Sequence, residues 1–560
     1  MRRTKIGLVG VSVLVVAVKF AARMTGGQSG VDPVLIDHVG FTAAPQLKLE
    51  PVRSASFVLD CRVTGHPISP LIYGVGGDGP FWTTGATARR SGGNPTSRYN
   101  WELNTWNLAS DWFFRNRGDS NGSYDQFLQE NRQHGVKTAL TLPMLGWVAK
   151  DSTSYSFPVS VFGPQQFTAW DAIDAGNGIG RDGKPLTPEP PTRTSVPSTP
   201  ESIQRWVHQI RDRDRTRGRS VDQYILDNEP MLWNATHRDV HPEPATYDEL
   251  LEKTIAYASA VRRADPEATI AGPAEWGWLA YHYSARDVAA GVHLRPDRRL
   301  HGDVPLIPWY LRKIREHEKR TGARILDVLD VHFYSMGQGV GAGTNGETDP
   351  ATAALRIRST RSLWDPTYLD ESWINERMRV LPLLRQWVQE NHPGLGVSIG
   401  EWSFGAETHM SGGLATAEAL GRFGTEGLTS AYYWTIPVER SPAFWAFRAY
   451  RNFDGAGGHF LDWSVPVRAE GTLASLFASR DSNRRHIVAV LLNFAPLSPL
   501  AAHINLEACG PVAAAGAFTY AGGNDGFTKL EVSVPGRGLE AAVTPYSITV
   551  LDVSLQPSPR

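Results

Sequence analysis

Eight short apolar segments, separated by helical stretches and long connections, limit the fold of this 560-residue chain more than any other feature. The segments are rich in β-branched and aromatic residues and are bounded by turn residues, a pattern typical of buried strands. Their centres are Ile72, Arg90, Leu140, Ile225, Ile270, Val331, Ile399 and Tyr432. Because strands alternate with helices over residues 65–445, the chain predicts an α/β fold with a parallel sheet closed as a (β/α)8 barrel.

A second domain is predicted from the change of pattern after residue 446. Short alternating segments between residues 473 and 553 indicate strands without intervening helices, so residues 446–560 predict an all-β sandwich. An isolated strand at residues 54–63 precedes the barrel. Because an unpaired strand exposes backbone hydrogen-bonding groups, we expect it to join this sandwich, with residues 26–64 forming a linker and that strand.

The two cysteines, Cys61 and Cys509, belong to the two parts of this composite domain. A disulfide between them would persist in an oxidising compartment. The alternative is a pair of buried free thiols, which behave as small apolar residues.

The amino terminus has the character of a targeting segment. Residues 1–5 carry three basic side chains, and the apolar run of residues 6–18 is shorter than the about 20 residues of a membrane span. We therefore expect residues 1–25 to be a signal peptide of a secreted or extracytoplasmic protein. An uncleaved amino-terminal membrane anchor is the alternative, and no membrane contact is expected of the mature domain.

The balance of charge argues against a nucleic-acid partner. Lys plus Arg number 56 against 57 for Asp plus Glu, so a basic excess for binding phosphates is missing from the sequence. With 20% charged and 41% apolar residues the chain is globular, and we expect a monomer.

Asp227, Asn228 and Glu229 close the predicted strand at residues 221–226, just before Pro230. In a parallel barrel this is the edge that carries catalytic residues. Desolvating a carboxylate there costs several kcal/mol, so a carboxylate at this position is expected to have a charged or hydrogen-bonding partner or a function. The alternative is a strand-ending turn in which Asp227 and Asn228 cap loop amides.

Glu401 ends another predicted strand, so two glutamates close the fourth and seventh strands of the barrel. Retaining glycoside hydrolysis needs two such carboxyls about 5 Å apart, one as acid/base and one as nucleophile. The pattern H-E-x-x-H of metalloproteases is absent from the sequence, and Glu401 occupies the place that serine holds in a nucleophile elbow.

Further side chains are candidates for binding a sugar near these carboxyls. Asn228 could bind the 2-OH or cap a loop, and Arg90 could keep Glu401 ionised or form a surface ion pair. His332 and Tyr334 end the sixth strand, where the alternative for His332 is a satisfied core position. Tryptophans that could stack on sugars, although each alone is more often core, are Trp101, Trp106, Trp364, Trp373 and Trp434.

No cofactor is expected, and a structural calcium is the one metal considered. The long loop of residues 157–200 contains Asp171, Asp174, Asn177 and Asp182, which carry oxygen ligands. Their spacing differs from that of an EF-hand, so solvated turn residues are the favoured interpretation.

Several of these motifs together resemble glycoside hydrolase family 44. They are residues 73–78, residues 90–94 with Asn94, residues 99–101, residues 227–230 with Trp233, residues 236–242 and residues 400–401. The resemblance covers roughly residues 60–555 and implies a barrel with a companion β domain. It implies retaining endo-hydrolysis of β-1,4-glucans and xyloglucan, with Glu229 matching the acid/base and Glu401 the nucleophile.

One position departs from the family pattern. Trp402 stands where a tyrosine is expected, and an indole cannot accept the hydrogen bond that a phenol near the reacting centre could. Two alternatives to a β-glucanase stay open: a hydrolase of another β-linked plant polysaccharide, such as mannan or xylan, and a non-catalytic carbohydrate-binding protein.

Overall fold

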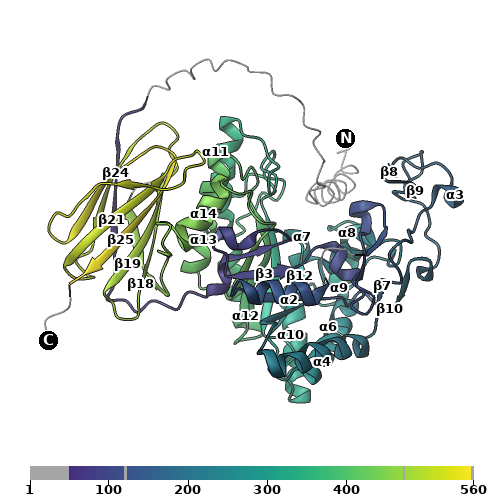
Figure 1. Ribbon diagram of the computed structural model, residues 1–560. Helices are drawn as coiled ribbons and strands as arrows, with labels where there is room; N and C mark the ends of the chain where they lie inside the picture. Colours follow the sequence, from purple (N-terminus) through teal and green to yellow (C-terminus); the bar gives the residue numbers. More distant parts are fainter. Residues whose placement is uncertain (1–48, 119–122, 471–472, 557–560) are drawn as a thin grey trace, which may run out of the picture.

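The computed structural model describes residues 49–118, 123–470 and 473–556, arranged as a barrel beside a β domain (Figure 1). The predicted signal peptide and most of the predicted linker lie outside the described residues. Within the described ranges, no helix combines the length and the apolar character needed to cross a membrane.

The barrel is a closed ring of eight strands in which every pairing is parallel, as predicted. In chain order the strands are β2 (Gly74–Gly76), β3 (Ala88–Ser91), β6 (Lys137–Leu142), β11 (Gln223–Leu226), β12 (Ile270–Glu275), β13 (Val328–Tyr334), β14 (Gly396–Ser403) and β15 (Ser430–Tyr433). All predicted strand centres fall inside these strands except Ile72. That residue belongs to the 3-10 helix η1 (Pro70–Tyr73), which leads directly into β2.

Helices surround the barrel and fill its connections. The longer ones are α2 (Tyr124–Gln133), α4 (Pro200–Arg217), α6 (Tyr247–Ala264), α10 (Leu306–Thr321), α11 (Pro350–Ser359), α12 (Val380–Asn391), α13 (Met410–Thr425) and α14 (Pro442–Arg451). Short ones are α3 (Val159–Phe162), α5 (Trp233–Thr236), α7 (Trp278–His282), α8 (Ala285–Ala290) and α9 (Pro296–Leu300). Helix α14 packs against α13 and runs through residue 445, so the predicted domain boundary there falls inside a barrel helix.

Local sequence explains why α4 begins and ends where it does. Thr199 accepts a hydrogen bond from the backbone of Ser202, whose hydroxyl bonds back to Thr199, and Pro200 occupies the first helical position. The apolar face of α4 is buried, and Gly218 ends the helix with a positive φ of 77°.

Two sheets form the β domain. One has the order β17-β1-β20-β24-β23 and the other β16-β18-β19-β25-β21-β22. Their bounds are β1 (Arg53–Leu59), β16 (Trp463–Val465), β17 (Val467–Glu470), β18 (Ala474–Arg480), β19 (His486–Asn493), β20 (Leu500–Asn505), β21 (Val512–Tyr520), β22 (Thr528–Leu530), β23 (Val532–Ser533), β24 (Gly538–Val543) and β25 (Ser547–Leu555). Buried side chains of both sheets, among them Phe57, Leu491 and Ile504, form one core between them.

Strand β1 completes this domain from the other end of the chain. It pairs in parallel with β20 and antiparallel with β17, so the expected composite domain is confirmed. Cys61 follows β1 and is joined by a disulfide to Cys509, with their Cα atoms 4.8 Å apart. The structure thus holds the disulfide and not the two free thiols.

The two domains pack through helix α13, which Figure 1 shows between the barrel and the strands β18, β19 and β25. The contact is close at Gly421, where an added Cβ would lie 2.2 Å from the ring of Phe477. Glycine at this position therefore sets how closely the helix approaches the sheet.

Candidate active site

The turn after β11 is held by the carboxyl of Asp227, which lies in the left-handed region with a φ of 61°. It accepts hydrogen bonds from Ser97 Oγ at 2.5 Å, Leu145 N at 2.9 Å and Trp233 Nε1 at 3.2 Å. The amides of Met144 and Asn228 also donate to it. Asp227 therefore caps loop amides, one of the two roles considered for it, and its hydrogen bonds fix the path of the next residues.

Glu229 follows with a φ of 49°, and its backbone is tied to the end of the neighbouring strand β12. The amide of Glu229 donates to Ala274 O at 3.0 Å, and Met231 N donates to Glu275 Oε2 at 3.4 Å. Glu275 is fully buried, and burial raises its pKa well above the usual range, which favours the neutral carboxyl. Sequence reasoning missed this role, although Glu275 closes a strand just as Glu229 and Glu401 do.

Glu401 and Trp402 occupy successive positions of β14, so their side chains point to opposite faces of the barrel wall. Glu401 faces the other carboxyl, whereas Trp402 is fully buried in the outer layer. The indole of Trp402 packs edge-on against Phe423 and Tyr433, each with ring centroids 5.0 Å away. The difference between tyrosine and tryptophan at residue 402 therefore falls on the side of β14 that faces away from the two carboxyls.

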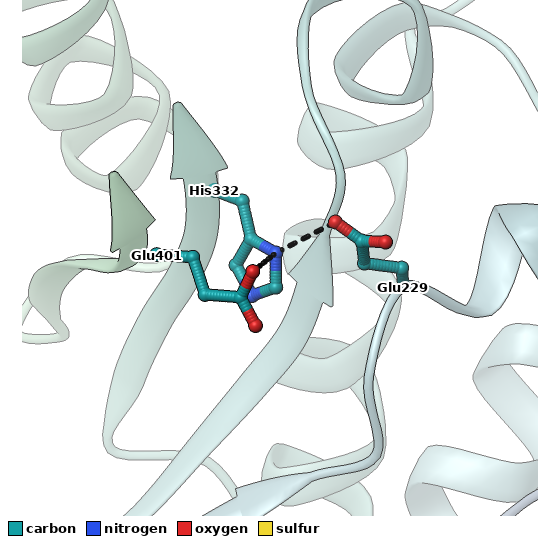
Figure 2. A group of neighbouring side chains, drawn as sticks. All are labelled: Glu229, His332 and Glu401. Atoms are coloured by element: carbon teal, nitrogen blue, oxygen red, sulfur yellow. Dashed lines mark hydrogen bonds and ion pairs between the residues drawn. The ribbon is translucent and has the colours of Figure 1, made fainter. Parts of the chain in front are cut away.

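His332 lies between the two glutamates, as Figure 2 shows. Its Nδ1 is 2.9 Å from Glu229 Oε1 and 3.5 Å from Glu401 Oε2. One atom of each of the three side chains lies within 4.8 Å of the other two. Among the described residues this is the one group of three or more His, Cys, Asp or Glu side chains with such spacing.

Arg90 of β3 is fully buried and touches four of the surrounding groups. Its Nη1 is 2.9 Å from Glu401 Oε1 and donates to Gly400 O at 2.6 Å, while Nη2 donates to Asn228 Oδ1 at 3.2 Å. Nη1 also lies 3.2 Å from His332 Nε2. The alternative of a surface ion pair for Arg90 is therefore wrong, and its cation is directed at Glu401.

The barrel interior is polar next to Arg90. Asp330 of β13 is fully buried there, and a Cβ at residue 400 would lie 2.4 Å from Asp330 Oδ2. Glycine at residue 400 thus leaves the space that the Asp330 carboxyl fills.

The two glutamates differ in their electrostatic surroundings. Burial, then the charge of Glu401, raises the pKa of Glu229 well above its usual range. Burial also raises the pKa of Glu401, but Arg90 and the Tyr334 hydroxyl, which donates to Glu401 Oε2 at 3.0 Å, lower it. Glu229 is therefore the carboxyl that keeps its proton, and Glu401 the one that ionises first.

Asn228 and Asn94 form a hydrogen-bonded row beside the carboxyls. Asn228 Oδ1 accepts from Gly93 N at 3.2 Å, and its Nδ2 donates to Asn94 Oδ1 at 3.2 Å. Asn94 Nδ2 in turn lies 3.1 Å from both carboxyl oxygens of Asp111. Burial, opposed by Asn94, raises the pKa of Asp111 to about 7. Asp111 was missed by the sequence reasoning because it lies in the 3-10 helix η4 (Ala109–Trp112), away from any strand end.

Two of the five candidate tryptophans, Trp434 and Trp106, lie near these residues, and Trp101 is linked to them through Trp206. The ring of Trp434 covers Gly93, where an added Cβ would lie 2.8 Å from it. Trp106 lines a cavity of ≈ 540 Å³ that also reaches Arg90. Trp101 is partly exposed and stacks in parallel on Trp206, with ring centroids 6.3 Å apart.

The structure does not bring Trp364 and Trp373 to this group. The guanidinium of Arg422 on α13 covers the Trp364 ring at 3.6 Å and also contacts Phe477 of the β domain. Trp364 therefore packs between the two domains. Trp373 is 40% exposed and lies on the connection that precedes α12. An ion pair between Glu371 of this connection and Arg358 of α11 holds the connection in the outer layer.

The four candidate calcium ligands bond to separate protein groups. Asp171 pairs with Arg115 at 2.6 Å, and Asp174 accepts from Ser160 and Tyr155. The side-chain oxygens of Asn177 and Asp182 each accept from a backbone amide two residues further on. Their described contacts are those of turn-forming side chains.

Two carboxyls at the ends of the fourth and seventh strands of a parallel barrel, one with a raised pKa and the other beside a cation, match the site of a barrel glycoside hydrolase. Comparison with known proteins agrees with this class. The family model for glycoside hydrolase family 44 matches residues 105–337. The chain belongs to this family.

Individual relatives extend the similarity over most of the chain. Endoglucanase A of Paenibacillus lautus is 31% identical over 465 residues, which are 78% of this chain and 64% of that protein. This chain thus spans slightly less than two thirds of that relative. The solved structure of CelM2, a bifunctional glucanase-xylanase from a metagenome library, superposes with a TM-score of 0.85 at 34% identity, covering 90% of this chain and all of CelM2. A Paenibacillus polymyxa xyloglucanase of family 44 gives 0.75 at 26% identity, with the same coverage.

Proposed function

We propose that this protein is a retaining endo-acting glycoside hydrolase that cleaves β-1,4-glucan backbones. The observation that carries the proposal is the spacing of the two carboxyls, which place oxygens within 4.8 Å of each other. Retaining enzymes hold their carboxyls about 5–5.5 Å apart, whereas inverting enzymes leave about 6.5–9.5 Å for a water molecule.

In the first step Glu401 attacks the anomeric carbon while Glu229 gives its proton to the leaving glycosidic oxygen. The bond from sugar to leaving oxygen breaks as the bond to Glu401 forms. In the second step Glu229, now ionised, takes a proton from water, which displaces Glu401 and releases the sugar. The raised pKa of Glu229 suits the acid, and the cation of Arg90 suits the ionised nucleophile.

The neighbouring side chains orient these two carboxyls. Arg90 and Tyr334 together contact both oxygens of Glu401, while His332 contacts Glu229. One hydrogen of Asn228 Nδ2 is bonded to Asn94, and the second would serve the sugar 2-OH. Both proton transfers and the nucleophilic attack use side chains of this chain, so the reaction needs no cofactor.

The proposed substrates are cellulose-type glucans and xyloglucan. Names of relatives support this choice, because they include an endoglucanase, a glucanase-xylanase and a xyloglucanase. We propose that the protein acts as a monomer outside the cytoplasm, where such polymers occur and where the disulfide between Cys61 and Cys509 persists. The presence of both glutamates disfavours a role in carbohydrate binding alone.

The test follows products on a panel of xyloglucan, a soluble cellulose derivative, glucomannan and xylan. Proton NMR of early products should show the β-anomer first on the preferred glucan. An α-anomer appearing first would overturn the assignment of Glu401 as nucleophile. Release of reducing sugar from xylan or mannan alone would move the protein to the alternative substrate class.

A further inference from the structure

A hairpin in the connection between β6 and β11 exposes several large apolar side chains. It contains α3, β8 (Thr168–Ala169) and β9 (Ala172–Gly176), and we call residues 158–186 the arm. Figure 1 shows α3, β8 and β9 projecting from the barrel on the side opposite the β domain. Trp170 is 81% exposed, Ile173 78%, Phe167 66% and Val161 55%. Of the large hydrophobic residues that the structure describes as exposed, Trp170 is the most exposed.

Polar side chains hold the arm together from within. Asp174 accepts hydrogen bonds from Ser160 N at 2.7 Å and Tyr155 Oη at 2.8 Å. The buried Gln165 donates to Phe157 O at 2.8 Å and accepts from Gly178 N at 2.5 Å. Hydrogen bonds of Asp174 and the buried Gln165 therefore help to fix the arm, while its large apolar side chains Trp170, Ile173 and Phe167 face solvent.

The base of the arm is attached to the segment that carries the acid/base. Arg238, nine residues after Glu229, donates to Asn177 O at 2.6 Å. Its guanidinium also lies 4.6 Å from the ring centroid of Phe114 and 4.7 Å from that of Phe157. The arm leaves the barrel after β6, whose parallel neighbour β11 leads to Glu229. The arm is therefore a continuation of the barrel edge that carries the carboxyls.

We propose that the arm is a second binding site for the polymer, at which the exposed aromatic rings stack on pyranose rings of a neutral β-linked glucan chain. This rests on the proposed function, since the occupant is a more distant part of the same substrate. Aromatic rings offer large apolar area at low entropic cost, and exposed apolar groups of this kind mark binding surfaces.

The charges at the tip and the size of the patch favour this occupant. Asp171, which adjoins Trp170, is paired with Arg115, so the acid beside the most exposed ring does not call for a cationic partner. Two aromatic and two aliphatic side chains expose less area than the about 800 Å² per partner of a stable protein interface. An extended polymer needs only a few stacked rings.

The experiment uses the full chain with Glu401→Gln, so that polymer is bound without being cleaved. Phe167→Ser with Trp170→Ser removes the aromatic surface, and Leu300→Ser is the matched control, since Leu300 is 74% exposed on α9. Native gels containing xyloglucan or hydroxyethylcellulose give apparent Kd values. We expect the arm variant to bind at least about fivefold more weakly than the control protein, and Trp170→Phe to retain binding.

Three outcomes overturn the proposal. In the first, the polymer gel retards the arm variant and the control equally. In the second, the gel does not retard the protein although the protein cleaves the same polymer. In the third, the wild type is a dimer that the arm substitutions convert to a monomer without loss of polymer binding. Reducing-sugar release by the chain with Glu401 intact tests the proposed function separately. Retention without cleavage would leave the arm site standing and reject the hydrolase.

Discussion

Arg90 Nη1 lies 3.2 Å from Nε2 of His332, and both side chains are fully buried. A guanidinium has only hydrogens to offer, so the imidazole Nε2 must accept. The ring proton of His332 is then on Nδ1, which donates to Glu229 Oε1 at 2.9 Å. Burial and the charge of Arg90 lower the pKa of His332 well below its usual range, so the ring is neutral. Because Oε1 accepts this bond, Oε2 is the oxygen of Glu229 that is free to carry the acid proton.

The first prediction concerns the two carboxyls themselves. Glu229→Ala and Glu401→Ala should each reduce kcat by at least about 10³-fold, because each removes one of the two chemical groups. Added azide should restore part of the rate to one variant by occupying the vacated space. Glu407→Gln is the control, since Glu407 is also buried but pairs with Tyr433. Near-normal turnover by either alanine variant would show that its residue is structural.

The second prediction separates Tyr334 from an ordinary buried tyrosine. The Tyr334 hydroxyl bonds to Glu401 and lowers the pKa of that carboxyl. Tyr334→Phe should therefore shift the acidic limb of the kcat/KM profile to higher pH and reduce kcat by about tenfold to 10²-fold.

Tyr433→Phe is the matched control for this experiment, because Tyr433 donates to Glu407 Oε2 at the same distance of 3.0 Å. This variant should lose stability without moving the acidic limb. Equal pH profiles for the two variants would remove Tyr334 from the machinery of the site.

Much of the site could be predicted because strand ends converge in a parallel barrel. Glu229, Glu401, His332 and Tyr334 each close a strand, so counting strands was sufficient to bring them to one edge. The alternation of side chains along β14 decides the role of Trp402, and it could have been applied to the sequence.

Other features depend on contacts between distant segments of the chain that no pattern in the sequence predicts. Asp111 reaches the site through its bond to Asn94 from an irregular connection. Trp364 is removed from it because Arg422 of α13 covers its ring. Neither residue carries a periodic signal, since both positions are set by how loops pack and not by a strand or helix repeat.

The third prediction is a pH dependence of stability caused by Glu275. Its pKa is raised in the folded state by burial, so the folded protein binds a proton that the unfolded chain releases. The stability from this group is fully present below its unfolded pKa and is lost as pH rises through its folded pKa. Glu275→Gln cannot ionise, so its stability should fall less than that of the wild type as pH rises.

Chemical denaturation at a series of pH values measures this difference, with Glu376→Gln on an exposed connection as the control. If the free energies of unfolding of the wild type and Glu275→Gln changed equally with pH, the raised pKa of Glu275 would be contradicted. Since Glu275 also accepts the Met231 amide, Glu275→Gln should lower kcat only modestly, because the amide oxygen can still accept that bond.

The last prediction concerns the disulfide that joins β1 to the rest of the β domain. Cys61 and Cys509 are separated by 448 residues, so their bond restricts the unfolded chain over nearly its whole described length. On the chain-entropy model a loop of this length corresponds to roughly 6 kcal/mol. Without the bond, β1 stays in place only through its pairing with β17 and β20 and the packing of residues such as Phe57.

Cys61→Ser with Cys509→Ser should therefore lower the Tm of the β domain by several degrees, and reductant should lower the wild-type Tm to the same value. Activity at low temperature should persist, because the carboxyls lie in the barrel. A wild-type Tm that does not respond to reductant would show that β1 is held by its strand pairing alone.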